Sequence, residues 1–324
     1  MKIGVLGTGA FGVSLALILN ENGHKVSMWT KFEEEANFLD QQRRSPNLKN
    51  IIIDKDIQIS TNFKKTVEEA DLIVIAVPAA FVDDVSQELK EYLKNNQHVC
   101  IASKGIENDS CLFVYDVFKK YIDIDRVGVI SGPTFAIDVA NKVPVGLSLA
   151  STNQKTIEII KQALQNSHVK LRETNDILGI EICGSIKNVI AIANGMLDGM
   201  DLPISTQAMM ITESLNDIKE LIDTLGGDKN TILSFAGFGD LLLTCTSTKS
   251  RNFSFGRLLG KGVSQEEIDR YIETTTIEGL YTLKSIYQLL ENKKVNMPII
   301  NLIYDIIYHD KKPEDLLTFL IQKG

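Results

Sequence analysis

Glycines near the N-terminus have the spacing of a phosphate-binding turn. Residues 7–12 read Gly-Thr-Gly-Ala-Phe-Gly and fit the pattern G-x-G-x-x-G. They follow the hydrophobic run Lys2–Leu6 and open the helical segment Phe11–Asn22, which is the order of a dinucleotide-binding unit. In such units the first glycine permits a tight turn, the second lets the backbone approach a pyrophosphate, and the third allows close helix–strand packing. The segment predicts a dinucleotide site at Gly7, Gly9 and Gly12, and a glycine-rich turn without a ligand is the alternative.

The end of the second predicted strand bears on the type of cofactor. A site specific for NAD usually has Asp or Glu there, bound to the 2′-hydroxyl of the ribose. In this chain the strand Lys25–Trp29 is followed by Thr30 and Lys31. The ammonium of Lys31 could neutralise a 2′-phosphate, which favours NADP or the use of both cofactors. The alternative is a lysine that faces solvent, with Glu33 and Glu34 close by in the sequence.

A predicted helix over Ile180–Met200 places a lysine among small residues. Side chains three or four residues apart share one helix face, and here that face holds Glu181, Gly184, Lys187, Asn188, Ala191 and Gly195. Glycine inside a helix costs about 1 kcal/mol relative to alanine, so we interpret the small residues as room for a ligand. A desolvated lysine beside another cation has a lowered pKa and can act as general acid or base. Tight packing of another helix against this face, with Lys187 reaching solvent, is the alternative.

Two more polar groups follow predicted strands of the first half. Lys104 comes after the strand Val99–Ala102, and Gly132-Pro133-Thr134 follows the strand Val127–Ile130. The carboxyl ends of parallel strands form the ligand crevice of open α/β sheets. Lys104 and the Thr134 hydroxyl are therefore candidates for contact with a substrate. A surface lysine and a helix-capping threonine are the alternatives.

The second half adds a carboxylate and a cluster of donors. Asp240 could orient or balance a catalytic ammonium. Ser250, Arg251 and Asn252 are adjacent, and the guanidinium of Arg251 offers a planar fork to a phosphate dianion. A flexible polar surface loop is the alternative for this segment.

The elements that must position these residues follow two patterns. Strand-like runs alternate with amphipathic segments in the first half, and several of the runs are apolar throughout, as in parallel strands buried on both faces. The predicted strands are Lys2–Leu6, Lys25–Trp29, Ile57–Ser60, Leu72–Ala76, Val99–Ala102, Val127–Ile130 and Gly146–Ala150. After about Glu173 long helical periodicities dominate. We predict an α/β Rossmann-type doubly wound domain over residues 1–175 and a mainly α-helical substrate and catalytic domain over residues 176–324.

Composition limits the classes of protein. The chain has 324 residues, 44% of them hydrophobic and 23% charged, as in a globular protein. A net charge of −8 disfavours a nucleic-acid partner, although a local group of cations could still bind a small anion. The 4 cysteines have neither zinc nor disulfide-framework spacing, so we expect reduced thiols and no metal site. Glycines interrupt the uncharged run Ile3–Asn20, so we expect neither a signal peptide nor integral membrane contact, and a cytoplasmic location.

These motifs, in this order, resemble the bacterial-type NAD(P)-dependent glycerol-3-phosphate dehydrogenases over nearly the whole chain. The resemblance rests on GTGAFG (7–12), SKGIE (103–107), SGPTFA (131–136), GIEICGSIKNVIAIANGMLDG (179–199), GFGDLLLTCTSTKSRNFSFG (237–256) and EG (278–279). It implies interconversion of dihydroxyacetone phosphate and sn-glycerol 3-phosphate with NADPH or NADH, a supply of glycerol 3-phosphate for phospholipid synthesis, and a homodimer.

The resemblance also assigns roles to residues of this chain. Lys187 matches the catalytic acid/base, Lys104 a residue that contacts both cofactor and substrate, and Asp240 a group that orients Lys187 or binds a substrate hydroxyl. The substrate-binding positions are Lys104, Gly132, Thr134, Lys187, Asp240, Ser250, Arg251 and Asn252. The cofactor-binding positions are Gly7, Gly9, Ala10, Phe11, Gly12, Lys31, Lys104, Ala136, Arg251, Thr276 and Glu278.

The chain departs from the family in a few places, and two other functions are open. The family commonly has Ser-Trp where this chain has Ala10-Phe11, so backbone N–H groups must make the pyrophosphate contact there, and Thr134 replaces a serine but keeps the hydroxyl. One alternative function is another hydroxyacid or sugar-phosphate dehydrogenase of similar architecture, which the Ser-Arg-Asn segment disfavours. The other is a non-catalytic NAD(P)-binding sensor, which the presence of Lys104, Lys187 and Asp240 together disfavours.

Overall fold

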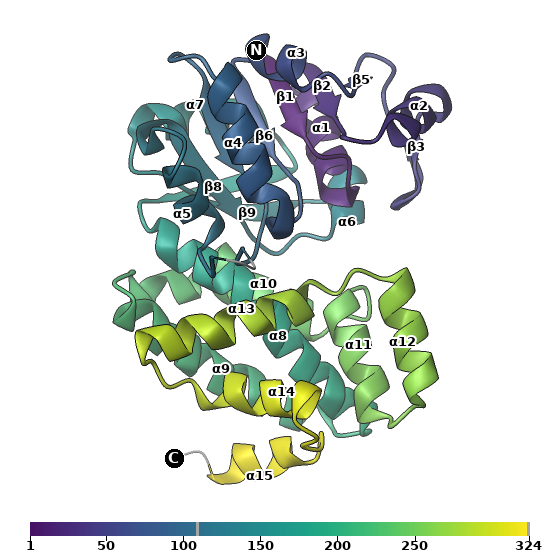
Figure 1. Cartoon of the computed structure of the whole chain (residues 1–324), viewed down its shortest axis with the longest axis vertical. Helices are drawn as coiled ribbons and strands as arrows, with labels where there is room; N and C mark the ends of the chain where they lie inside the picture. Colours follow the sequence, from purple (N-terminus) through teal and green to yellow (C-terminus); the bar gives the residue numbers. More distant parts are fainter. Residues whose placement is uncertain (108–109, 323–324) are drawn as a thin grey trace. The chain divides into compact units, whose positions relative to one another are not determined.

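The chain forms two compact units, which are coloured by sequence in Figure 1. The computed structural model describes residues 1–107 and 110–322. One unit, here called the sheet unit, comprises Met1–Lys104 and Val114–Ile177, and the helical unit comprises Gly105–Phe113 and Leu178–Gly324. Gly105–Phe113 belongs to the helical unit because Ile106, Cys111 and Phe113 are part of its hydrophobic core.

The sheet unit is built on an eight-stranded sheet in the described part of the chain, with the order β10-β9-β8-β7-β6-β1-β2-β5. Its strands are β1 (Lys2–Leu6), β2 (Lys25–Trp29), β5 (Gln58–Ser60), β6 (Leu72–Ile75), β7 (His98–Ile101), β8 (Val127–Ser131), β9 (Val145–Ala150) and β10 (Val169–Thr174). A separate hairpin pairs β3 (Arg44–Ser45) with β4 (Leu48–Ile52). The predicted Rossmann-type α/β domain is confirmed.

Two features of the sheet differ from the prediction. Strand β9 runs antiparallel to β8, because the connection between them carries only the short helix α6 (Ala136–Ala140), and parallel crossovers usually need a longer one. Strand β10 was not predicted. Its buried Val169 and Leu171 alternate with exposed Lys170 and Arg172, so this edge strand lacks the apolar run of the central strands.

Helices cover both faces of the sheet. Alternation along β6 places Leu72 and Val74 in one core with residues of α1 (Ala10–Glu21) and α7 (Gln154–Leu164). Ile73 and Ile75 are equally buried and, by the two-residue period of a strand, belong to the opposite face. The other helices of this unit are α2 (Glu33–Gln42), α3 (Phe63–Glu68), α4 (Val82–Tyr92) and α5 (Val114–Lys119), and α4 contacts both α3 and α5.

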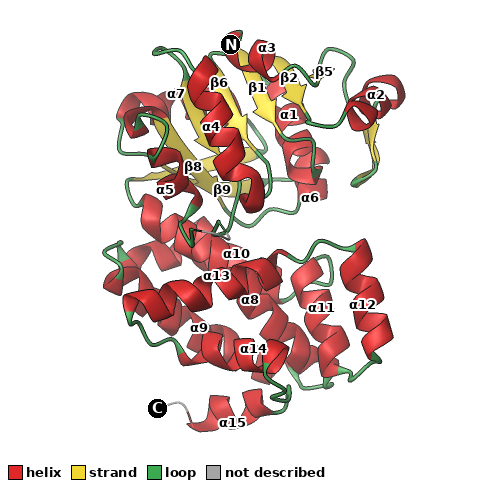
Figure 2. Cartoon of the chain, viewed as in Figure 1, coloured by secondary structure: helices red, strands yellow, loops and turns green. Residues whose placement is uncertain are grey.

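The helical unit is arranged around one central helix, and Figure 2 shows helices throughout this unit. The central helix is α8 (Ile177–Gly199), which is long and apolar enough to span a membrane by composition, but 94% of its apolar window is buried inside the fold. The remaining helices are α9 (Ile204–Thr224), α10 (Asp240–Cys245), α11 (Arg251–Gly260), α12 (Gln265–Thr274), α13 (Glu278–Lys293), α14 (Pro298–Tyr308) and α15 (Asp315–Gln322). A short turn, η4 (Phe235–Gly239), leads into α10.

Glycines let α8 and α11 cross at backbone contact. A Cβ atom at Gly195 of α8 would lie 2.1 Å from the carbonyl oxygen of Phe253, and one at Gly256 of α11 would lie 2.0 Å from that of Ile192. No side chain fits in that space. The interpretation of Gly195 as room for a ligand is therefore wrong, since the neighbouring helix fills the space.

A buried histidine of the sheet unit makes its stability depend on pH. His98 is 4% exposed on β7, and its Nδ1 lies 3.0 Å from the hydroxyl oxygen of Thr156. Burial, with Lys155 and Arg126 nearby, lowers the pKa of His98 below its ordinary 6.5. As the pH falls through 6.5, His98 takes up a proton in the unfolded chain before it does so in the folded chain, and this favours unfolding. The free energy of unfolding therefore keeps its full value above pH 6.5 and declines as the pH falls.

We expect His98→Gln to reduce the slope of the unfolding free energy against pH between about pH 5 and pH 6.5. Glutamine retains a polar partner for Thr156 without a titrating ring. Denaturant unfolding at a series of pH values measures the slope, and His168→Gln serves as the control. Burial also lowers the pKa of His24, so some slope should remain. An unchanged slope in His98→Gln would contradict this account.

Candidate active site

The glycine turn leaves the start of α1 open to an anion. Gly7 has a φ of 116° and no room for a side chain, since a Cβ would lie 2.5 Å from the carbonyl oxygen of Ala76. Gly9 is the N-cap of α1, and nothing among the described residues lies within 4 Å of the position of its Cβ. Glycine has no side chain to cap a helix, so N–H groups of the first turn, which begins at Ala10, remain for a ligand. This geometry fits the pyrophosphate of a dinucleotide.

Apart from Lys104, the other predicted cofactor positions of the sheet unit lie close to this turn or just beyond β2. The Ser14 hydroxyl of α1 lies 2.7 Å from the carbonyl oxygen of Ala136 and 2.8 Å from that of Ala10, so these two positions are neighbours. Lys31 is exposed just beyond β2. The carboxylates of α2 turn back towards the strand ends, since Thr61 donates to Glu33 at 2.9 Å and Thr30 donates to Glu35. Lys31 therefore lies in a segment that carries both signs of charge.

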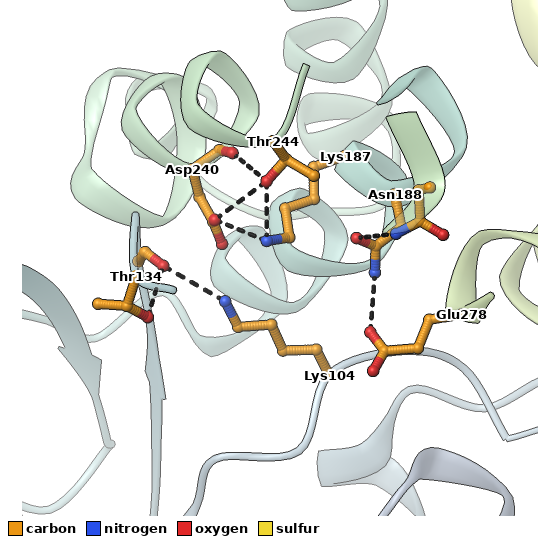
Figure 3. A network of polar contacts seen from close by, with 9 residues as sticks. Lys104, Thr134, Lys187, Asn188, Asp240, Thr244 and Glu278 are labelled. Atoms are coloured by element: carbon orange, nitrogen blue, oxygen red, sulfur yellow. Dashed lines mark hydrogen bonds and ion pairs between the residues drawn. The ribbon is translucent and has the colours of Figure 1, made fainter. Parts of the chain in front are cut away.

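Lys104, Gly132 and Thr134 meet at the carboxyl ends of β7 and β8. The Lys104 ammonium lies 3.4 Å from the carbonyl oxygen of Gly132, and the Thr134 hydroxyl lies 3.3 Å from the same oxygen (Figure 3). Gly132 is packed against β9, because a Cβ there would lie 2.5 Å from the carbonyl oxygen of Gly146. The helix-capping alternative for Thr134 is wrong, since the N-cap of α6 is Phe135.

Lys187 of α8 forms a buried ion pair. Its ammonium donates to a carboxylate oxygen of Asp240 at 2.6 Å and to the hydroxyl oxygen of Thr244 at 3.1 Å (Figure 3). Asp240 is 0% exposed and Lys187 8%, so the pair is shielded from water. The Thr244 hydroxyl donates to the backbone carbonyl of Asp240 at 2.6 Å, which turns its lone pairs towards the ammonium. An ammonium has three donors, and these contacts use two of them.

The Lys187 ammonium has two side-chain partners on α10. Asp240 lies against the ammonium as predicted. Thr244 was not singled out, although its spacing of four residues from Asp240 places both on one face of α10. Cys245 follows it, and burial raises the pKa of this thiol far above its ordinary range, so the thiol stays protonated.

The Ser-Arg-Asn segment forms the start of α11. The Ser250 hydroxyl caps this helix by accepting from the backbone N–H of Phe253 at 3.3 Å. Arg251 is half-exposed and pairs with Glu278 of α13 at 3.3 Å. Asn252 is buried, and its side-chain oxygen accepts from the backbone N–H of Gly279 at 2.8 Å. The alternative of a flexible surface loop is wrong for these residues.

Asn188 connects this segment to α8. Its side-chain oxygen accepts from the Asn252 amide at 2.9 Å, and its own amide donates to Glu278 at 3.3 Å (Figure 3). We noted Asn188 on the face of Lys187 but assigned it no role. The network fixes the start of α11 relative to the residue next to Lys187. Thr276, just before α13, lines a hollow of about 440 Å³ together with Tyr281 and Lys284.

The described residues contain no group of three or more His, Cys, Asp or Glu side chains that could hold a metal ion. Cys100, Cys111, Cys183 and Cys245 are all buried. The candidate site described above is built from ammonium, guanidinium, carboxylate and hydroxyl groups.

A Rossmann-type unit with an open phosphate-binding turn, and a helical unit with a buried lysine–aspartate pair, define a two-part NAD(P)-dependent dehydrogenase. The chain belongs to the NAD-dependent glycerol-3-phosphate dehydrogenase family. Residues 2–157 match the N-terminal part of that family and residues 176–318 its C-terminal part. The resemblance inferred from the motifs is confirmed, and the chain is an NAD(P)-dependent oxidoreductase.

Individual relatives match this chain over nearly their full length. A glycerol-3-phosphate dehydrogenase (NAD(P)+) from a Thermoanaerobacter species is 36% identical over 323 residues, which cover 100% of this chain and 97% of the relative. The same enzyme from Staphylococcus haemolyticus is 34% identical over 99% of this chain and 97% of the relative. The crystal structure of glycerol-3-phosphate dehydrogenase from Coxiella burnetii is 30% identical with a TM-score of 0.93, and 99% of each chain is covered. The Plasmodium falciparum enzyme, at 20% identity and a TM-score of 0.89 over 100% of this chain and 96% of that one, shares the fold.

Proposed function

We propose that the chain interconverts dihydroxyacetone phosphate and sn-glycerol 3-phosphate with NADPH or NADH, and so supplies glycerol 3-phosphate for phospholipid synthesis. The observation that carries the proposal is the water-shielded ion pair of Lys187 with Asp240, which sets a proton donor in a polar site. The family membership of the chain and the names of its relatives support the choice of substrate.

The dinucleotide is held by the sheet unit's glycine turn and by polar residues along the chain. Backbone N–H groups at Gly9, Ala10 and Phe11 meet the pyrophosphate, with Gly7 and Gly12 shaping the turn. When bound, the reduced nicotinamide supplies a hydride to the ketone carbon of the substrate. We assign Lys31 to the 2′-phosphate of NADPH, and a comparison of catalytic efficiency with NADPH and with NADH measures that preference. The remaining cofactor positions are Lys104, Ala136, Arg251, Thr276 and Glu278.

Lys187 moves the proton of the reaction. Its ammonium donates to the carbonyl oxygen on which negative charge develops, and in the reverse direction the neutral amine accepts the hydroxyl proton. Asp240 and Thr244 hold the ammonium by two of its donors and leave the third for the substrate oxygen. Lys104 adds a second positive charge that stabilises the alkoxide.

Arg251 holds the phosphate of the substrate, with Ser250 and Asn252 at the start of α11. A guanidinium fork and the first turn of a helix both favour a phosphate dianion. The backbone at Gly132 and the hydroxyl of Thr134 complete the substrate contacts. Binding energy at the phosphate then fixes the geometry at the ketone carbon.

The wider organisation is part of the same proposal. We assign the dinucleotide to the domain of residues 1–175 and the substrate to the domain of residues 176–324. A homodimer, which the family resemblance implies, and a cytoplasmic location complete the proposal.

We expect Arg251→Ala to lower kcat/KM for dihydroxyacetone phosphate by about 10- to 150-fold, the range that corresponds to one hydrogen bond to a charged group. Reduction of dihydroxyacetone, which lacks the phosphate, should change little. Steady-state kinetics with both substrates at saturating cofactor measure the difference. Lys261→Ala removes one positive charge just beyond the opposite end of α11 and is the matched control. An unchanged KM for the phosphorylated substrate would contradict the role of Arg251.

A further inference from the structure

A buried amide on α8 bonds to the helix that carries Asp240. Asn194 is 0% exposed, and its side-chain N–H donates to the backbone carbonyl of Cys245 at 2.8 Å. Its side-chain oxygen is buried and has no hydrogen-bond partner among the described residues. A half-satisfied amide in a helix interior costs free energy that an alanine would avoid. The hydrogen bond to the carbonyl oxygen of Cys245 is therefore what an asparagine provides here and an apolar side chain could not.

The hydrogen bond from Asn194 stabilises helix α10, which is too short to be stable without contacts from its neighbours. Helix α10 has only 6 residues, and a helix of that length is marginal without outside contacts. The turn before it, η4, contains a non-helical residue at Gly237. Cys245 is the last residue of α10, where carbonyl groups lack partners within the helix. The amide of Asn194 satisfies one of them.

Helix α8 thus forms hydrogen bonds with both ends of α10. Lys187 bonds to Asp240, the first residue of α10, and Asn194 bonds to Cys245, the last. Lys187 and Asn194 are seven residues apart, about 10.5 Å along α8 at 1.5 Å per residue, and lie on the same face. Thr244 lies next to Cys245 and accepts from the Lys187 ammonium at 3.1 Å. The contact made by Asn194 is therefore adjacent in sequence to one of the two acceptors of that ammonium.

We propose that Asn194 is a positioning residue for the proton transfer: its bond to Cys245 holds the C-terminal end of α10, so that Thr244 and Asp240 keep the Lys187 ammonium in one orientation. This inference rests on the proposed role of Lys187 as the proton donor. Asn194 acts on the chemistry only through α10. Its loss should lower kcat and leave the contacts of Arg251 with the substrate phosphate intact.

The test replaces Asn194 with leucine, which has a similar volume and no donor, and with alanine as a second variant should leucine not fold. We expect kcat for dihydroxyacetone phosphate to fall about tenfold, as for the loss of one buried hydrogen bond. KM should stay within about twofold, because α11 is untouched, and the pH profile of kcat should shift because the acceptors of the ammonium move. The double variant Asn194→Leu/Thr244→Ala should be no slower than Thr244→Ala alone, since both act at one point.

Ser185→Ala is the matched control. Ser185 is also on α8, is 1% exposed, and has a buried hydroxyl without a hydrogen-bond partner among the described residues. Removing it deletes a buried polar group two residues from Lys187 and leaves the bond to α10 intact. Its kcat and pH profile should match those of the unaltered chain.

Hydrogen exchange gives a readout that does not depend on activity. Amide exchange in a peptide covering residues 240–246 should speed up in Asn194→Leu and not in Ser185→Ala, while peptides from α12 exchange as before. Unaltered exchange in 240–246, or a fall in thermal stability with kcat and its pH profile unchanged, would overturn the proposal. Failure of the unaltered chain to reduce dihydroxyacetone phosphate would instead refute the proposed function, and exchange would still decide whether Asn194 holds α10.

Discussion

Replacing Lys187 with methionine should lower kcat for the reduction of dihydroxyacetone phosphate by about 10²–10⁴-fold, the contribution typical of a positioned general acid. Methionine fills much of the same space but carries no proton. The effect should appear in kcat more than in KM, since the proton is needed only as the alkoxide forms. Steady-state kinetics with NADH and NADPH measure both constants. Turnover close to that of the unaltered chain would refute the assignment of Lys187.

Loss of activity could also arise from loss of folding, and the buried pair allows the two to be separated. Lys187→Met removes the ammonium from the carboxylate of Asp240, which is 0% exposed. Removing one member of a buried ion pair costs about 3–5 kcal/mol, so thermal stability should drop sharply in the single variant. Lys187→Met/Asp240→Leu removes both charges and should recover most of that stability, because apolar replacement of a buried pair is often neutral. The double variant should fold well and still turn over slowly.

The second large effect is expected at the crossing of α8 and α11. Alanine in place of glycine inside a helix normally stabilises by about 1 kcal/mol. At Gly256 the added Cβ would lie 2.0 Å from the carbonyl oxygen of Ile192, and backbone cannot rotate away as a side chain can. The two helices must move apart, so Gly256→Ala should destabilise the chain by about 1–3 kcal/mol. Thermal unfolding followed by circular dichroism measures the change.

The displacement of α11 should also weaken substrate binding, because Ser250, Arg251 and Asn252 lie at the start of this helix. KM for dihydroxyacetone phosphate should therefore rise in Gly256→Ala. Gly195→Ala/Gly256→Ala should lose less than the sum of its single variants, since helices already separated accept a second methyl group. Thr212→Ala, at an exposed position of α9, is the control and should change stability little. A rise in stability for Gly256→Ala would contradict the account.

Local patterns in the sequence were enough to predict the main strands and helices of the sheet unit and the glycine turn. Strand β1, the turn at Gly7–Gly12 and helix α1 follow one another directly, so their chemistry can be read from neighbouring residues. Apolar runs likewise predicted the central strands. Strand β10 was missed because its charged residues break the apolar run, and the reversal of β9 depends on a connection whose path is not encoded in hydropathy.

The candidate site was recovered only in part. The resemblance assigned Lys187, Asp240 and Arg251, and the periodicity of α8 placed Asn188 on the face of Lys187. The packing of other helices decided what these residues contact. Because of that packing, Thr244 bonds to the Lys187 ammonium, and Asn188 bonds to Glu278, which is 90 residues away. Gly195 shows the same limit, since small residues on a helix face indicate a close approach but do not say whether a ligand or a helix makes it.

The sequence by itself determined the family, the dinucleotide-binding class and the residue types available for proton transfer and phosphate binding, because each is encoded in short motifs with fixed spacing. Tertiary structure alone decided that Lys187 is paired with Asp240, 53 residues away, and that Asn194 bonds to the far end of α10. The reason is physical: local propensity sets which helices form, but the contacts between distant helices depend on how their surfaces pack.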